Sequence, residues 1–158
     1  AVNFTADEFT LGLSAITSAS SSTAATDDED GVVKMYTNYG AVVVADGKIV
    51  AALNDATQPN ITIDVFGDIV DASFKGTKRE LGPDYGMTVA SAIGVEWDAQ
   101  SDAFSKYVVG MTGEEVAALE TQEHNGHQIS VDETLLASCS MDITGMMEVF
   151  AEAFAYAR

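Results

Sequence analysis

The sequence is poor in cysteine and proline, and it has no long hydrophobic run. Its single cysteine, Cys139, excludes an intramolecular disulfide and any metal cage built from several thiolates. Apolar stretches such as 41–45 are far shorter than the roughly 20 residues of a membrane-spanning helix. At 158 residues, the chain is predicted to fold as one domain over residues 1–158, with no transmembrane segment.

Positive charge is also scarce. Seven Lys and Arg residues stand against 25 Asp and Glu residues, which gives a formal net charge of −18. A chain so acidic repels nucleic acid and anionic lipid, so neither is expected as a partner. Hydrophobic residues nevertheless make up 47 % of the sequence, which is too many for a disordered chain.

The same composition bears on location. Acidity combined with many Ser and Thr residues suits an extracellular setting, and the sequence starts at Ala1 without a basic and apolar leader. These features predict an extracellular or cell-surface protein that is exported by means of a cleaved signal peptide.

Strand patterns fill the first half of the chain. Phe9, Leu11 and Leu13 alternate with other residues, which predicts an N-terminal strand within residues 1–19. The segment 18–31 has no apolar periodicity and is predicted to be an acidic loop rich in Ser and Thr.

A hairpin is the clearest local signal. Asp46 and Gly47 separate two apolar runs, at 32–44 and 48–53, and this pattern is typical of two antiparallel strands joined by a tight turn. A further short strand is expected at 61–66, and the Gly-containing segment 75–87 is expected to be an irregular connection.

Helical patterns dominate the second half. One apolar stripe predicts a long helix at about 88–109, and Thr112 with Glu115 forms a capping box that opens a short helix. A late strand is expected at 138–143, and a C-terminal helix at about 145–157, capped by Thr144. The residues of this stripe are expected in the core: Ile93, Trp97, Phe104 and Val108. The aromatic pair of the C-terminal helix, Phe150 and Phe154, is expected there as well.

This order of elements predicts an α+β fold. A mostly antiparallel sheet from the first half, together with the late strand, would pack against the two longer helices. No internal repeat is visible.

Two groups of residues invite a metal site. Asp28 and Asp30 could occupy the third and fifth positions of a calcium loop, but Thr26 stands where the first carboxylate is needed. The acidic run is therefore either a weak calcium site or a solvated charged loop. His124 and His127 flank an Asn-Gly pair, which indicates either two metal ligands or a simple turn between polar ends.

Three of the seven cations lie within five positions. Lys75, Lys78 and Arg79 could hold a phosphate or a carboxylate together with nearby glycine N–H groups, or they could form ion pairs with the protein's own acids. No nucleotide-binding glycine motif and no Ser-His-Asp or Cys-His arrangement can be assembled from the sequence.

A family resemblance is carried by three stretches of the second half: TKRELGPDYGM, IGVEWDAQSDAFSKYVVGMTGEEV, and LLASCSMDI followed by a helix. In these stretches the chain resembles the FMN-binding-like or membrane-anchored lipoprotein group of exported clostridial proteins. It implies an exported protein with a related fold. The flavin-bearing members carry flavin on a threonine of a Ser-Gly-Ala-Thr run, and residues 137–141 contain no such threonine.

Because no catalytic set can be defined, the sequence predicts a non-enzymatic protein. It would act by self-association as a homo-oligomer or by binding another cell-surface protein, with Phe9, Leu11 and Leu13 on a strand that adds to a neighbour's sheet edge. The alternative is a protein that binds a small molecule and acts in extracytoplasmic electron transfer. Its cofactor would be flavin, and the three clustered cations would bind the flavin phosphate.

Overall fold

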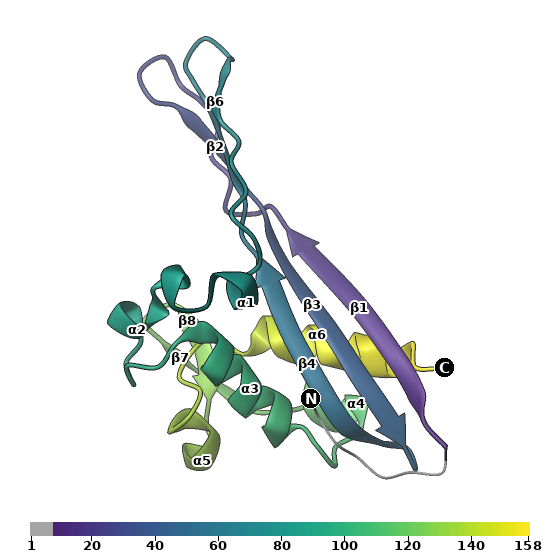
Figure 1. The fold of residues 1–158 in the computed structure, drawn as a ribbon. Coiled ribbons are helices and arrows are strands. Elements are labelled where there is room, and N and C mark those ends of the chain that lie inside the picture. The colour runs from purple at the N-terminus through teal and green to yellow at the C-terminus, as the bar shows by residue number, and fades with distance from the viewer. Residues whose placement is uncertain (1–7) are drawn as a thin grey trace.

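The computed structural model describes residues 8–158 and has an α+β fold, as the sequence predicted (Figure 1). Its strands form antiparallel sheets with the orders β1-β3-β4, β2-β5-β6 and β7-β8. The strands are β1 (Thr10–Ser18), β2 (Gly31–Lys34), β3 (Tyr36–Ala45), β4 (Lys48–Thr57), β5 (Asn60–Ile63), β6 (Ile69–Asp71), β7 (Thr121–His124) and β8 (His127–Ser130). The helices are α1 (Lys78–Leu81), the 3-10 turn η1 (Gly82–Tyr85), α2 (Met87–Ala90), α3 (Trp97–Tyr107), α4 (Gly113–Ala117), α5 (Glu133–Leu136) and α6 (Thr144–Ala155).

A long hairpin organises the first half. Asp46 and Gly47 adopt φ values of 51° and 72°, the conformation that a two-residue turn between paired strands requires. β3 and β4 pair along their length, starting from this turn. β2 and β5 continue the same two chain segments further from the turn and pair with each other. Between the two pairs, the N–H of Met35 donates a hydrogen bond to the carbonyl of Pro59. The predicted hairpin is thus confirmed, and it is longer than the sequence indicated.

The distal part of this hairpin projects from the body as an arm (Figure 1). We define the arm as residues 19–35 and 58–74. One of its two ends is the acidic loop at 26–30, and the other is the turn at 64–68, where Asp64 accepts hydrogen bonds from the N–H groups of Phe66 and Asp68. Most of the predicted loop at 18–31 therefore lies in the first segment of the arm, where Thr23 pairs with Val32 of β2.

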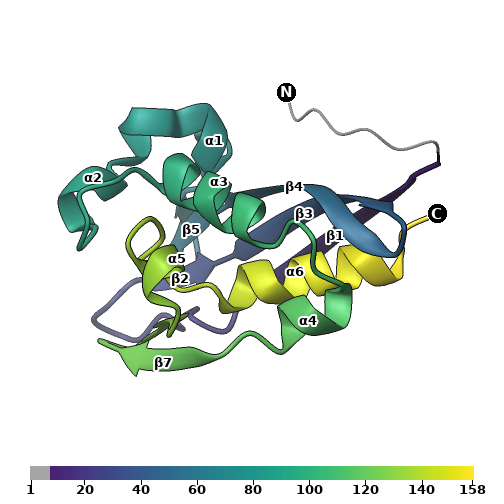
Figure 2. The same cartoon turned by 90° about the horizontal axis from the view of Figure 1, so that it is seen from below.

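Helix α6 lies against one face of the β1-β3-β4 sheet, with α4 beside it (Figure 2). Glycine at two sheet positions permits this close approach: a Cβ on Gly12 would lie 1.8 Å from the carbonyl oxygen of Ala153, and one on Gly40 would lie 2.9 Å from Val149. The C-terminus is tied to the sheet as well, because Arg158 and Leu11 exchange backbone hydrogen bonds.

The core lies between this inner sheet face, α3 and α6. Phe104 and Phe150 are fully buried and stack with their ring centroids 5.9 Å apart. Trp97 and Val108 belong to the same cluster, as predicted, and so does Cys139. Of the other residues predicted in the core, Phe154 is only partly buried against the cluster, and Ile93 is half-buried outside it.

One local prediction is inexact and two are wrong. The helix predicted at about 88–109 is present as α3, but it is shorter than predicted, because the chain turns at Gly94 with φ 66° and separates α3 from the short helix α2. Residues 138–143 form no strand but a turn that buries Cys139, and the late strands are instead β7 and β8. Thr144 does not cap α6: it is the first residue of the helix, and its N–H donates to the carboxylate of Asp142.

The segment predicted as an irregular connection also contains order. Thr77 and Glu80 form a capping box that opens α1, and η1 follows directly. The Thr-x-x-Glu spacing was visible in the sequence, but the helix that it opens is only one turn long.

Candidate functional site

A cavity of about 750 Å³ lies at the end of the inner sheet face, next to the base of the arm. Its walls come from the ends of β1 and β3, from the segment that runs from α1 to the start of α3, from the β7-β8 turn and from the start of α6. Residues far apart in the sequence thus meet here. The wall includes Ile16, Asn38, Lys78, Trp97, His127 and Thr144.

Lys78 is the most unusual group in this wall. It is only 6 % exposed, and its Nζ donates a hydrogen bond of 3.1 Å to the hydroxyl of Tyr36. Aromatic rings surround the same ammonium group: its distance to the ring centroid is 4.6 Å for Tyr36, 4.6 Å for Tyr85 and 5.1 Å for Trp97. Ring faces attract cations, so these rings stabilise a charge that burial disfavours.

Burial lowers the pKa of Lys78 to about 8, because an ammonium group is poorly solvated in this position. The charge of Asp55 acts in the opposite direction and only partly offsets the effect. The ion pairs found among residues 8–158 involve Lys48, Arg79 and His127 but not Lys78. Lys78 is therefore a buried cation that has aromatic neighbours and no directly bound carboxylate.

This lowered pKa predicts a specific dependence of stability on pH. The unfolded chain binds the proton of Lys78 more tightly than the folded protein does. Below pH 8 this difference lowers the free energy of unfolding by its full amount, and the loss becomes smaller as the pH rises above 8. We expect the free energy of unfolding to rise by about 2 kcal/mol from this group between pH 7 and pH 9.5, as measured by urea unfolding.

Lys78→Met should remove this rise, and Lys75→Met, which changes an exposed lysine three positions away, should retain it. Burial also raises the pKa values of Tyr36 and Tyr85, so neither tyrosine ionises in the folded protein within this range. If the free energy of unfolding rose equally with pH in the wild type and in Lys78→Met, the prediction would be contradicted.

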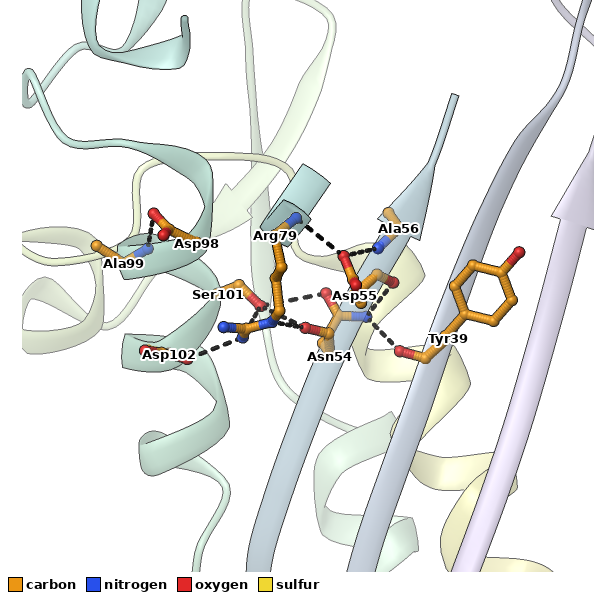
Figure 3. A network of polar contacts seen from close by, with 9 residues as sticks. All are labelled: Tyr39, Asn54, Asp55, Ala56, Arg79, Asp98, Ala99, Ser101 and Asp102. Carbon is orange, nitrogen blue, oxygen red and sulfur yellow. Dashed lines mark hydrogen bonds and ion pairs between the residues drawn. The ribbon is translucent and has the colours of Figure 1, made fainter. Parts of the chain in front are cut away.

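Arg79 has different surroundings from Lys78, although the two residues are adjacent. Its guanidinium pairs with Asp102 at 2.8 Å and contacts Ser101 at 3.2 Å, both on α3, and its Nε donates to the carbonyl of Asn54 on β4 (Figure 3). Asp55 completes the network by accepting hydrogen bonds from the N–H groups of Arg79 and Ala56. Arg79 thus joins α1, α3 and β4.

The three cations that are close in sequence therefore do not surround one point. Lys78 lines the cavity, Arg79 is held by the network of Figure 3, and Lys75 is exposed. The sequence could not indicate the aromatic cage, because Tyr36, Tyr85 and Trp97 come from separate segments and share no local pattern.

The histidines lie at the cavity wall. His124 and His127 face each other across the β7-β8 turn, and His127 Nδ1 lies 3.9 Å from a carboxylate oxygen of Asp142. Asp28 and Asp30 are exposed in the acidic loop of the arm. Among residues 8–158, no group of three or more His, Cys, Asp or Glu side chains could hold a metal ion.

Phe9, Leu11 and Leu13 are exposed by 54, 56 and 72 %. Leu11 and Leu13 pair with Val43 and Ala41, and they point away from the face that Gly12 presents to α6. This open sheet face also contains Tyr39 and Leu53, which are 40 and 50 % exposed. Residues 1–7 of the predicted N-terminal strand lie outside the described residues.

The arm carries a second group of exposed apolar side chains. Phe66 at the end of the arm is 87 % exposed, and the group continues down β6 to Phe74. Its members are Val65, Phe66, Ile69, Val70 and Phe74. We refer to them as the arm patch.

No protein-family model matches the chain, and searches of curated proteins and of solved structures also found no match. The resemblance to the FMN-binding-like group therefore stays a prediction. None of the helices in the described part of the chain has both the length and the apolar character needed to cross a bilayer.

Proposed function

We propose that this protein is a non-enzymatic, exported cell-surface subunit that assembles with copies of itself, the arm of one copy docking on the open sheet face of the next. The observation that carries the proposal is the presence of two separate apolar surfaces, the arm patch and the open sheet face. The exported setting rests on the acidic, Ser- and Thr-rich composition.

The open sheet face is suited to binding a strand. Leu13 and Leu53 are at least half exposed and lie on the face opposite α6. β1 is also an edge strand of its sheet. Within the described chain, the backbone of Arg158 hydrogen-bonds to this edge, and it does so only at Leu11. Because hydrogen-bonding directions alternate along a strand, the N–H and C=O groups of Leu13, Ala15 and Thr17 face outwards. Apolar side chains and an unpaired edge together form a binding site for another strand.

The arm supplies such a strand. β6 is the edge of the arm sheet, and Ile69 and Val70 on it are 67 and 57 % exposed. A narrow ribbon with so much exposed apolar surface gains stability when it packs against another body. The arm continues the strand direction of β3 and β4 away from the body (Figure 1), so its end does not fold back onto its own sheet face. A second copy offers that face.

A contact between two different surfaces has a consequence for the assembly. Each copy that donates its arm still offers its own sheet face, so the contacts repeat head to tail and give a ring or a filament. The net charge of −18 opposes this association at low ionic strength. We therefore expect assembly to strengthen as salt is added, whereas a contact held by ion pairs would weaken.

Sedimentation of two complementary variants tests the proposal. Leu13→Asp places a charge on the sheet face, and Phe66→Asp places one on the arm patch. We expect the wild type to form large assemblies in 0.5 M salt, and each variant alone to form none. An equimolar mixture should form a dimer, because the intact arm of Leu13→Asp can still dock on the intact sheet face of Phe66→Asp.

Val89→Asp is the matched control, since Val89 is 94 % exposed on α2 and belongs to neither surface. It should assemble like the wild type. A wild type that stays monomeric at every salt and calcium concentration and at high protein concentration would overturn self-assembly, as would a mixture without dimers. Calcium is included because the acidic loop contains Asp28 and Asp30, the predicted weak calcium ligands.

A further inference from the structure

We propose that the cavity beside the arm binds a small monocarboxylate, whose carboxylate pairs with the Lys78 ammonium and whose apolar part contacts Trp97 and the neighbouring methionines. This site is separate from the surfaces proposed for assembly, and neither proposal depends on the other.

Lys78 provides the reason for an anionic ligand. Its ammonium is buried and uses one of its three donors on Tyr36, and no carboxylate of the described chain forms an ion pair with it. Burying a cation without a counter-ion is unfavourable, and an anion from outside would reverse that penalty. Lys78 and the three rings around it all line the cavity, so an anion that enters can reach the ammonium.

The remaining charges limit the ligand to a single negative charge. Asp142 and Glu148 also line the cavity, and the whole chain carries a large negative charge. A monoanion neutralises Lys78, whereas a phosphate dianion would leave an excess charge near these two carboxylates. Asp142 already accepts hydrogen bonds from the N–H and hydroxyl groups of Thr144 at the start of α6, so the attraction for the ligand's anion comes from Lys78 and not from this helix end.

The rest of the wall favours an apolar ligand body. Trp97 and Met146 are 4 and 3 % exposed, and Met87 and Ile129 complete the apolar part of the wall. Methionine and tryptophan side chains bind flat or flexible apolar groups well, since they are polarisable and adapt to shape. A carboxylate at one end of an apolar body therefore matches the cavity.

Trp97 makes the test direct, because it is the only tryptophan in the chain and its ring lies beside Lys78. The probes are benzoate and hexanoate, with benzamide and hexanamide as neutral counterparts of the same shape. We expect at least one carboxylate to change the Trp97 emission saturably in the wild type, and the matching amide to bind at least tenfold more weakly.

Lys78→Met should weaken carboxylate binding at least tenfold, and Lys75→Met should leave it unchanged. A measurement on the wild type covers the case in which Lys78→Met does not fold. Lysine side-chain NMR should show the pKa of Lys78 rising from about 8 towards the ordinary value of lysine when the cavity is filled.

Several outcomes would overturn the inference. They are the absence of saturable binding by either carboxylate, equal affinity for acid and amide, and an unchanged pKa of Lys78 at saturation. Tighter binding of inorganic phosphate or FMN than of both carboxylates would also overturn the monocarboxylate assignment, and tight FMN binding would instead support the flavin alternative.

Discussion

Phe104→Ala will destabilise the protein by about 3 to 5 kcal/mol, the range measured when a buried phenylalanine is replaced by alanine. Phe104 is completely buried and stacks on Phe150, so its ring joins α3 to α6 across the core. Alanine would leave a cavity where the two helices meet. Because small domains are stable by only about 5 to 15 kcal/mol, this loss is a large part of the total. Urea unfolding followed by circular dichroism measures it.

Phe66→Ala is the matched control for Phe104→Ala. It removes the same ring from a position that is 87 % exposed at the end of the arm. The expected change is within about 0.5 kcal/mol when the protein is monomeric. If the two variants lost similar stability, the core described above between α3 and α6 would be incorrect.

Gly12→Ala will destabilise the protein by about 3 kcal/mol or more, at the upper end of the cost of overpacking. The added Cβ would lie 1.8 Å from the carbonyl oxygen of Ala153, which is a backbone atom of α6 and cannot rotate away. β1 and α6 must therefore separate. Unfolding experiments give the stability, and hydrogen exchange should show faster exchange of the Leu11 and Arg158 amides, which hydrogen-bond to each other's carbonyl groups.

Ala15→Val is the control for Gly12→Ala. Ala15 lies on the same strand, points to the open sheet face and is exposed, so a larger side chain has room there. Its effect should be within about 0.5 kcal/mol. Equal losses for the two variants would mean that α6 does not approach β1 as closely as described.

Local signals predicted the fold class and much of the architecture. The Asp46-Gly47 turn, the capping box at Thr112 and the buried aromatic residues of α3 and α6 depend on residues close in sequence, and the structure contains them. The strand predicted at 138–143 is wrong because alternating apolar residues can also line a buried turn, as Cys139 does. The sequence predicted strand in the runs at 32–44 and 61–66, which contain most of β2 and most of β5, but it did not indicate that these strands pair as an arm, because that pairing joins segments distant in sequence.

The candidate site was only partly visible in the sequence. The cations at 75–79 stood out in an acidic chain, but which of them would be buried depended on how α1 packs. Lys78 and Arg79 are neighbours on a one-turn helix, and their side chains leave it in different directions, one towards Tyr36 and the other towards Asp102. Such a difference arises from tertiary contacts, which residue type and spacing do not encode.

The continuity between the arm and the body bears on how the protein responds to mechanical force. β2 and β5 run directly into β3 and β4, so a pull on the end of the arm passes along two covalent chains into the central sheet. Both chains are pulled in the same direction, and the hydrogen bonds between β3 and β4 are not torn apart one after another. β1 also enters the arm directly at its end, Ser18, so a pull on the acidic loop draws β1 and β3 in the same direction as well, and their nine residue pairs from Thr10↔Val44 to Ser18↔Tyr36 are not separated one at a time. We therefore expect tension applied at the end of the arm to enter the body through strands that are pulled in parallel.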